Sequence, residues 1–156
     1  MSDQFNLEYQ ALTQGAALQY RPDAGVLLLQ GEERADFLQR MTSNDIKRLR
    51  PGQSCVTVLT SPTARVLFVF TVICRENELW LLPARNETTG LERHLRGNIF
   101  FMDKVTVRNL SADWQRSRLM GATLDTLLPT LGFEKKLADN EWQAKDGILL
   151  VRQEQY

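Results

Sequence analysis

The sequence is poor in the residues that most often hold metal ions. Its 156 residues include one histidine and two cysteines. Zinc and iron sites need several histidine, cysteine or carboxylate ligands at defined spacings. His94 lies among charged neighbours, while Cys55 and Cys74 occupy separate apolar stretches. We therefore expect no metal site, an exposed helical histidine and two reduced cysteines in the core.

Net charge and long apolar runs are absent as well. Nineteen basic residues balance nineteen acidic ones, so no overall field favours nucleic acid or an anionic membrane. Residues 1–10 have neither the basic nor the apolar segment of a signal peptide. No apolar run approaches the length of a membrane span. These features predict a cytoplasmic protein that binds neither nucleic acid nor membrane.

Common catalytic and phosphate-binding signatures are also missing. The chain has no Gly-x-Ser-x-Gly elbow for a nucleophilic serine. It has neither a Gly-x-Gly-x-x-Gly loop nor a Walker A sequence. Composition and pattern alone therefore name no function.

What the sequence does contain is a mixture of strand and helix patterns. Residues 54–83 predict an antiparallel meander whose middle strand is the most buried. Asp146-Gly147 predicts a tight hairpin near the C-terminus. The mixture indicates an α+β fold with a mainly antiparallel sheet and packed helices. Strands are expected at 25–31, 54–60, 65–74, 79–83, 104–110 and 115–121, and helices within 32–41, 88–101 and 122–132.

Two residues stand out as possible ligand contacts. Arg65 precedes the apolar middle strand, where its guanidinium could bind a carboxylate; the alternative is a surface arginine in a turn. Trp80 lies in a short strand and could stack on a flat ligand; the alternative is a core tryptophan. The residues themselves leave both alternatives open.

Five segments in order resemble a known family. They are "GEERADFLQRMTSNDI", "LRPGQ", "LTSPTARVL", "GNIFFMDKVTVRNLSADW" and "LMGATLDTLL". Together they resemble the N-terminal half of the folate-binding aminomethyltransferase-like family, which includes the glycine cleavage T-protein and a folate-dependent protein that supports iron–sulfur enzymes. The resemblance covers residues 25–152 and is closer to the second group at "TSPTARVL". It implies that residues 1–156 form a single folate-binding-type domain, equivalent to the first part of the longer family chain.

The resemblance also implies a tetrahydrofolate pocket, but without its acid. The T-protein carries an aspartate pair on the strand after the glycine-rich turn, and the second aspartate faces the folate. In this chain the pair falls on Phe68 and Val69, neither of which can ionise or transfer a proton. We therefore expect no methylene transfer by this chain alone.

Six positions match folate-pocket positions of the family. Arg65 matches an arginine of the iron–sulfur branch, and Arg152 matches the entrance to a glycine-rich segment of the T-protein. That segment's glycines and acid are absent from "LLVRQEQY". The folate-binding residues implied by the resemblance are Val56, Arg65, Val69, Trp80, Leu82 and Arg152.

Three hypotheses follow from the resemblance. The first is a non-catalytic tetrahydrofolate-binding domain that supports iron–sulfur or one-carbon metabolism. The second is part of an aminomethyltransferase or a folate-linked demethylating enzyme, with the pocket completed by a partner chain. The third is a structural module with a collapsed pocket that forms a homo-oligomer.

Overall fold

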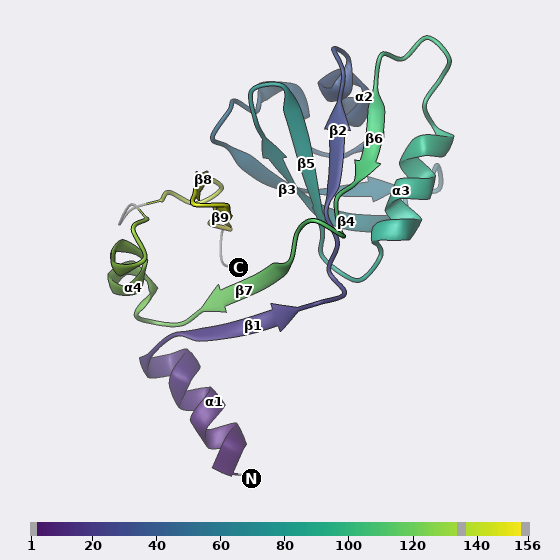
Figure 1. The fold of residues 1–156 in the computed structure, drawn as a ribbon. Helices are drawn as coiled ribbons and strands as arrows, with labels where there is room; N and C mark the ends of the chain where they lie inside the picture. The colour runs from purple at the N-terminus through teal and green to yellow at the C-terminus, as the bar shows by residue number, and fades with distance from the viewer. Residues whose placement is uncertain (1–2, 134–136, 154–156) are drawn as a thin grey trace.

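A computed structural model describes residues 3–133 and 137–153 of the chain. The architecture is mixed helix and antiparallel sheet, as the sequence predicted (Figure 1). A five-stranded sheet of order β3-β4-β5-β2-β6 forms the centre, and two two-stranded sheets, β1-β7 and β8-β9, accompany it. The elements are α1 (Asp3–Gln14), β1 (Ala17–Arg21), β2 (Leu27–Gln30), α2 (Arg34–Met41), the 3-10 helix η1 (Ile46–Arg48), β3 (Ser54–Thr60), β4 (Val66–Cys74), β5 (Glu78–Pro83), α3 (Thr88–Gly97), β6 (Thr106–Asn109), β7 (Arg116–Met120), α4 (Leu124–Thr130), β8 (Trp142–Lys145) and β9 (Ile148–Val151).

The predicted meander is confirmed, with a qualification about its middle strand. β4 pairs antiparallel with β3 and β5. Its second half is buried, but Val66 is 58% exposed and Leu67 is 39% exposed. The reason is length, because β5 pairs with β4 only from Phe70 onward. The first residues of β4 therefore extend beyond the sheet toward the turn.

Helices α2 and α3 cover one face of the five-stranded sheet. The apolar stripe predicted for α2 buries Phe37 and Leu38, and that of α3 buries Leu91 and Leu95. These side chains join the alternate residues of the central strands in one large cluster. Ile99 lies beyond the end of the helix but still packs against this cluster.

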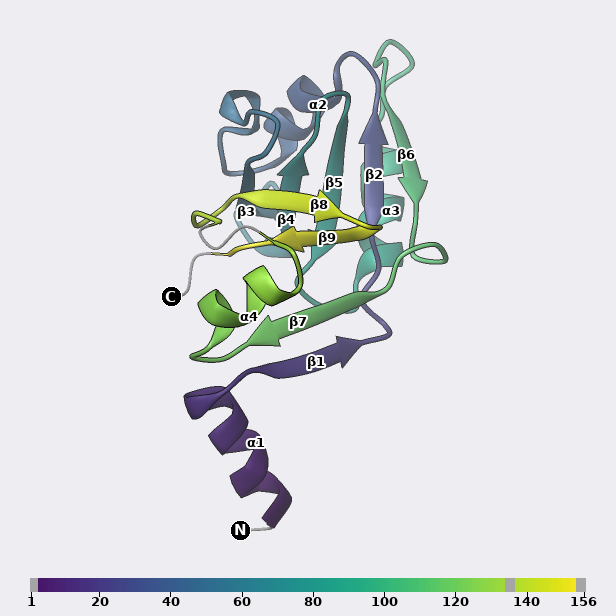
Figure 2. The ribbon, with the colours of Figure 1, turned by 60° about the vertical axis from the view of Figure 1, so that its left-hand side comes forward.

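The C-terminal hairpin is confirmed in place and in turn chemistry. β8 and β9 pair antiparallel around Asp146 and Gly147, whose φ angles are 49° and 78°. Positive φ at both central residues matches the twist of the flanking strands and is typical of a type I′ turn. The hairpin lies across the sheet face opposite α2 and α3 (Figure 2).

The N-terminal helix and strand β1 were not predicted, whereas β7 falls within the strand predicted at 115–121. α1 buries none of its residues and projects away from the rest of the molecule (Figures 1 and 2). β1 pairs with β7, a strand almost a hundred residues later in the chain, and neither strand is fully buried. Apolar residues recur at a regular spacing only where one face of a helix or strand is buried. α1 and β1 bury little, so their sequences carry no clear periodic signal.

Candidate functional site

The register of β3, β4 and β5 brings four predicted folate-site residues to one face of the sheet, namely Val56, Val69, Trp80 and Leu82. Val58 lies opposite Val69, and Thr71 lies opposite both Val56 and Leu82. Because side chains alternate along a strand, all five point to the same side. Val56, Val69 and Leu82 are partly buried there. We call Val56, Val69 and Leu82 the open patch.

The open patch lies on the face that the C-terminal hairpin covers only in part. Trp142, Leu149 and Val151 of the hairpin pack against a second apolar cluster that includes Ile73. The side-chain amide of Gln153 donates a hydrogen bond to the Thr71 hydroxyl. Thr71, which lies between Val56 and Leu82 in the register, is 4% exposed. The segment after the hairpin therefore covers the middle of the patch, and Val56, Val69 and Leu82 are partly buried around it.

The positions equivalent to the aspartate pair diverge across the sheet. Phe68 points to the helix side, where its ring lies 5.7 Å from the His94 ring. Val69 points to the open patch, so it occupies the orientation that the resemblance assigns to the catalytic aspartate. Neither side chain can hold a charge or move a proton. Among the described residues, no group of three or more histidine, cysteine or acidic side chains could hold a metal ion.

Trp80 is part of the second apolar cluster rather than of an exposed wall. It is 5% exposed, and its Nε1 donates a hydrogen bond of 2.9 Å to Glu78. The Trp114 ring meets it edge-on at 4.7 Å, and the Arg75 guanidinium lies 4.9 Å from its ring centre. Its ring faces are thus occupied by protein groups, as expected for a core tryptophan.

Arg65 lies at the tip of the β3–β4 hairpin. Its backbone nitrogen donates to the Ser61 hydroxyl and its carbonyl accepts from the Ser61 nitrogen. The side chain is exposed, and within the described residues its guanidinium makes no hydrogen bond or ion pair. Ala64, just before it, has a φ of 59°, which fits the tight turn. The structure thus places Arg65 in a solvent-exposed turn.

Arg152 ties the C-terminal hairpin to α4. Its Nε donates to Asp139 at 2.9 Å, and its Nη1 donates to Asp125 at 3.2 Å. These partners, Asp139 first, raise the pKa of Arg152. The guanidinium is therefore already neutralised by two carboxylates. The last residues of the matching segment, 154–156, lie outside the described residues.

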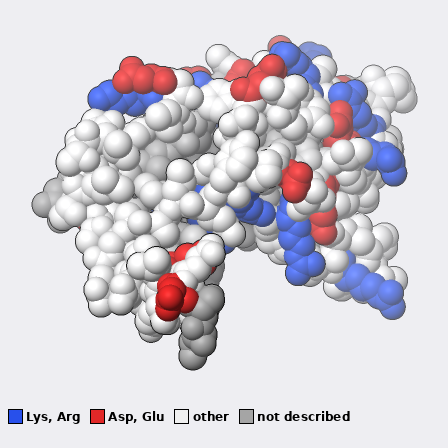
Figure 3. All heavy atoms as spheres, turned by 60° about the horizontal axis from the view of Figure 1, so that its bottom comes forward, with Lys and Arg blue, Asp and Glu red and all other residues white. Residues whose placement is uncertain are grey.

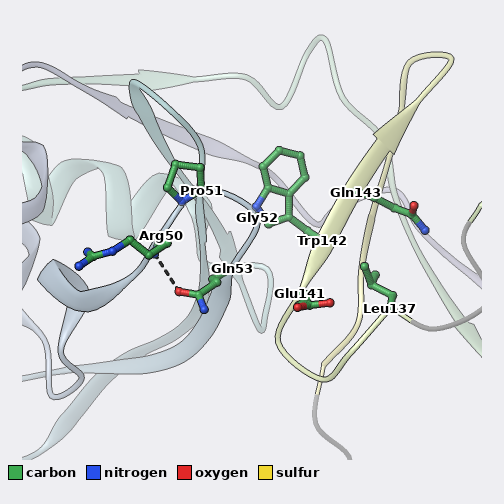
Figure 4. A pocket seen from close by; sticks show the side chains of 8 residues that line it. All are labelled: Arg50, Pro51, Gly52, Gln53, Leu137, Glu141, Trp142 and Gln143. Atoms are coloured by element: carbon green, nitrogen blue, oxygen red, sulfur yellow. Dashed lines mark hydrogen bonds between the residues drawn. The ribbon is translucent and has the colours of Figure 1, made fainter.

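A groove around Trp142 was not anticipated from the sequence. Two hollows of about 390 and 530 Å³ share Pro51, Gly52 and Trp142 (Figure 4). Trp142 Nε1 donates 2.8 Å to the Cys74 carbonyl, which fixes the ring beside the turn. Arg75 lies between the Trp142 and Trp80 rings. Pro51 and Gly52 come from one turn and Trp142 from a segment about ninety residues later in the chain, so no local pattern links them.

Comparison with known proteins shows that the fold is that of a domain of the aminomethyltransferase type. The chain belongs to the GCVT N-terminal domain family, whose family model matches residues 1–143. A crystal structure of the glycine cleavage system aminomethyltransferase T from Bartonella henselae is similar, with a TM-score of 0.78. Sequence identity to it is 18%, over 87% of this chain and 37% of that chain, so this likeness shows the fold.

Two curated relatives match shorter regions. A chloroplastic protein of Arabidopsis thaliana named "Putative transferase" is 30% identical over 87 residues, which are 56% of this chain and 20% of that protein. An aminomethyltransferase of Prochlorococcus marinus is 37% identical over 60 residues, which are 38% of this chain and 16% of that protein. The match thus spans about a fifth or less of each relative's length. In the described part of the chain, no helix is long and apolar enough to cross a membrane.

Proposed function

We propose that this chain is a non-catalytic tetrahydrofolate-binding-type domain, with residues 1–156 acting as one domain of a larger assembly. The observation that carries the proposal is the open patch. Its three residues match folate-pocket positions of the family, come from three adjacent strands, and lie on the same face of the sheet. A mainly apolar surface with a few polar groups suits a flat ligand.

The absence of a carboxylate at Val69 supports binding without catalysis. Proton transfer needs an ionisable group within hydrogen-bond reach of the reacting atom. Val69 presents two methyl groups where the resemblance expects an aspartate. We propose that the protein acts in the cytoplasm, in one-carbon metabolism or in supporting iron–sulfur enzymes. A domain that binds folate without this carboxylate would suffice for either role.

The remaining pocket walls would come from another polypeptide segment. The chain covers 37% of the similar aminomethyltransferase structure. The open patch lines one side of a ligand only, and Arg65 is exposed. A partner chain or a second copy would add the other side and would bring the Arg65 guanidinium into contact with the ligand.

Titration calorimetry with 5-formyltetrahydrofolate tests the proposal. We expect saturable micromolar binding that Val69→Ala weakens up to roughly 15-fold and Leu82→Ala up to roughly 60-fold, because they remove two and three carbon groups at about 0.8 kcal/mol apiece. Val66→Ala is the matched control, since Val66 lies on the same strand as Val69 but is 58% exposed. Equal effects of Val66→Ala and Val69→Ala would place the ligand elsewhere.

Two other functions predict different outcomes. Part of an aminomethyltransferase or a demethylating enzyme would bind folate or show activity only after a partner chain is added. A structural module would form a stable oligomer with no affinity for folate at millimolar concentrations. The second of these draws support from Trp80, whose ring is enclosed by Trp114 and Arg75.

A further inference from the structure

Three arginines share one face of the β1–β7 ribbon. Arg21 lies directly opposite Arg116 in the antiparallel register, and Arg118 follows Arg116 by two residues on β7. Residues two apart on a strand point to the same side, as do residues directly opposite across an antiparallel pair. Like charges in such positions repel one another. We call Arg21, Arg116 and Arg118 the arginine face.

The described part of the chain supplies this face with no acidic partner. None of the ion pairs formed by described residues includes any of the three arginines. Burial, and then repulsion from Arg21 and Arg118, lowers the pKa of Arg116 to about 10. Figure 3, which brings the lower end of Figure 1 forward, shows basic side chains in the hollow at the centre of the surface. An uncompensated cluster of this kind favours an added anion.

Two of the guanidinium groups are fixed in place by backbone carbonyls. Arg116 Nη1 donates to Pro83 at 2.8 Å and to Gly25 at 3.2 Å. Arg21 Nη2 donates to Ala84 at 2.8 Å. Each group keeps further N–H donors, because a guanidinium carries five of them. The face is therefore pre-organised and still has donors to offer.

The arginine face adjoins the open patch. Pro83 and Ala84, which accept these hydrogen bonds, directly follow Leu82 in the chain. The Ala84 nitrogen in turn donates 2.8 Å to the Val69 carbonyl. A ligand lying on Val69 and Leu82 would thus have the two fixed guanidinium groups at the end of strand β5.

We propose that the arginine face binds carboxylate groups and takes the glutamate tail of a folate whose rings lie on the open patch. The second half of this inference rests on the proposed function. Arginine suits the role because its planar fork meets a carboxylate with two parallel hydrogen bonds. Such pairing also offsets the mutual repulsion of the three arginines.

The test compares 5-formyltetrahydrofolate carrying one glutamate with the form carrying three, and includes γ-linked triglutamate alone. Calorimetry at low ionic strength is used because exposed charge pairs are screened by salt. We expect the three-glutamate form to bind roughly tenfold more tightly than the one-glutamate form, as a few exposed ion pairs together allow. Arg118→Gln should reduce this advantage roughly threefold. Arg118 is chosen because it is exposed and donates none of the hydrogen bonds that fix the ribbon.

Arg93→Gln is the matched control. Arg93 is also exposed, but it lies on α3, which covers the opposite face of the sheet. Circular dichroism of both variants checks that the fold is retained. An equal loss in both variants would overturn the inference, because it would show a general effect of net charge.

The outcomes separate this inference from the proposed function. One-glutamate folate binding with no advantage for three glutamates, and no binding of triglutamate, overturns the inference and leaves the proposed function standing. Arg118-dependent binding of triglutamate without any folate binding supports the carboxylate site and overturns the proposed function. No binding of any of the three compounds overturns both.

Discussion

The two faces of the five-stranded sheet are built from the same strands but serve different ends. On the helix side, Phe70, Val72 and Leu81 are fully buried beneath α2 and α3. On the other side, Val69 and Leu82, their direct neighbours in sequence, are only partly buried. Alternate residues of one strand thus serve stability and a candidate site in turn. We call the first the sealed face and the second the open face.

The size of the covering elements explains the difference. α2 and α3 are 8 and 10 residues long and each inserts two fully buried side chains into the sealed face. The hairpin strands β8 and β9 are 4 residues each and pack against the Ile73 and Trp80 end of the open face, which leaves Val56 and Val69 partly exposed. A longer covering element would have closed the open patch.

The two faces should differ most in the unfolding free energy that is lost when a charged residue is placed on β4. Val72→Asp should cost roughly 4 kcal/mol or more of unfolding free energy, because it buries an unpaired carboxylate among apolar groups. Val69→Asp should cost roughly 1–2 kcal/mol, because water reaches the open face. Urea denaturation of the two variants checks this. Equal losses would contradict the distinction between the faces.

Truncation of two adjacent leucines on β5 gives the next largest effect. Leu81 is fully buried on the sealed face, so Leu81→Ala should cost about 3 kcal/mol through lost burial and a cavity. Leu82→Ala on the open face should cost about 1 kcal/mol, because water can fill the space left. Both substitutions replace leucine by alanine on the same strand. The difference between their denaturation midpoints therefore reports how much more deeply the sealed face is buried than the open face. A larger loss for Leu82→Ala would reverse the assignment.

Substitutions of Trp142 test how strongly the C-terminal hairpin is bound to the open face of the sheet. Trp142→Ala removes ring packing and the hydrogen bond to the Cys74 carbonyl, and should cost roughly 2–3 kcal/mol. Trp142→Phe keeps most of the packing and should cost about 1 kcal/mol, the usual worth of one hydrogen bond. Hydrogen exchange should also quicken in β9 in the first variant. Unchanged exchange there would show that the hairpin is held by other contacts.

The smallest expected effect concerns the thiols on the sealed face. Burial raises the pKa of both Cys55 and Cys74 above the ordinary value. The folded state therefore favours the protonated thiols, so stability is full below pH ~8.5 and declines as the pH rises through the raised values. Denaturation at pH 7 and pH 10 should show this decline, and Cys74→Ala should reduce it. A stability that rises over that range would contradict the burial of these thiols.

Local patterns predicted the parts of the fold that bury a periodic face. The meander, α2, α3 and the Asp-Gly hairpin were all predicted, because strand alternation, helical spacing and turn residues are local signals. α1, β1 and the pairing of β1 with β7 were missed, since α1 buries nothing and β1 pairs with a strand far along the chain.

For the candidate site, the sequence could predict only which face of the sheet a strand residue lies on, because side chains alternate between the faces. Because side chains alternate along a strand, Val69 must lie on the face of the sheet that Phe68 does not occupy. The face that carries the open patch therefore follows from the sequence. The burial of Trp80 depends on Trp114 and Arg75, and the pairing of Arg152 depends on Asp125 and Asp139. Those contacts join distant segments, and no local pattern encodes them.

Methyl-group NMR on the valine and leucine side chains, with and without 5-formyltetrahydrofolate, tests the central claim most directly. The aromatic rings of a bound folate shift the signals of methyl groups they cover. We predict shifts at Val56, Val69 and Leu82 of the open patch, and none at Leu91 and Leu95 beneath the sealed face. Saturating ligand that leaves the open patch unshifted, or shifts only signals around the Trp142 groove, would contradict the account.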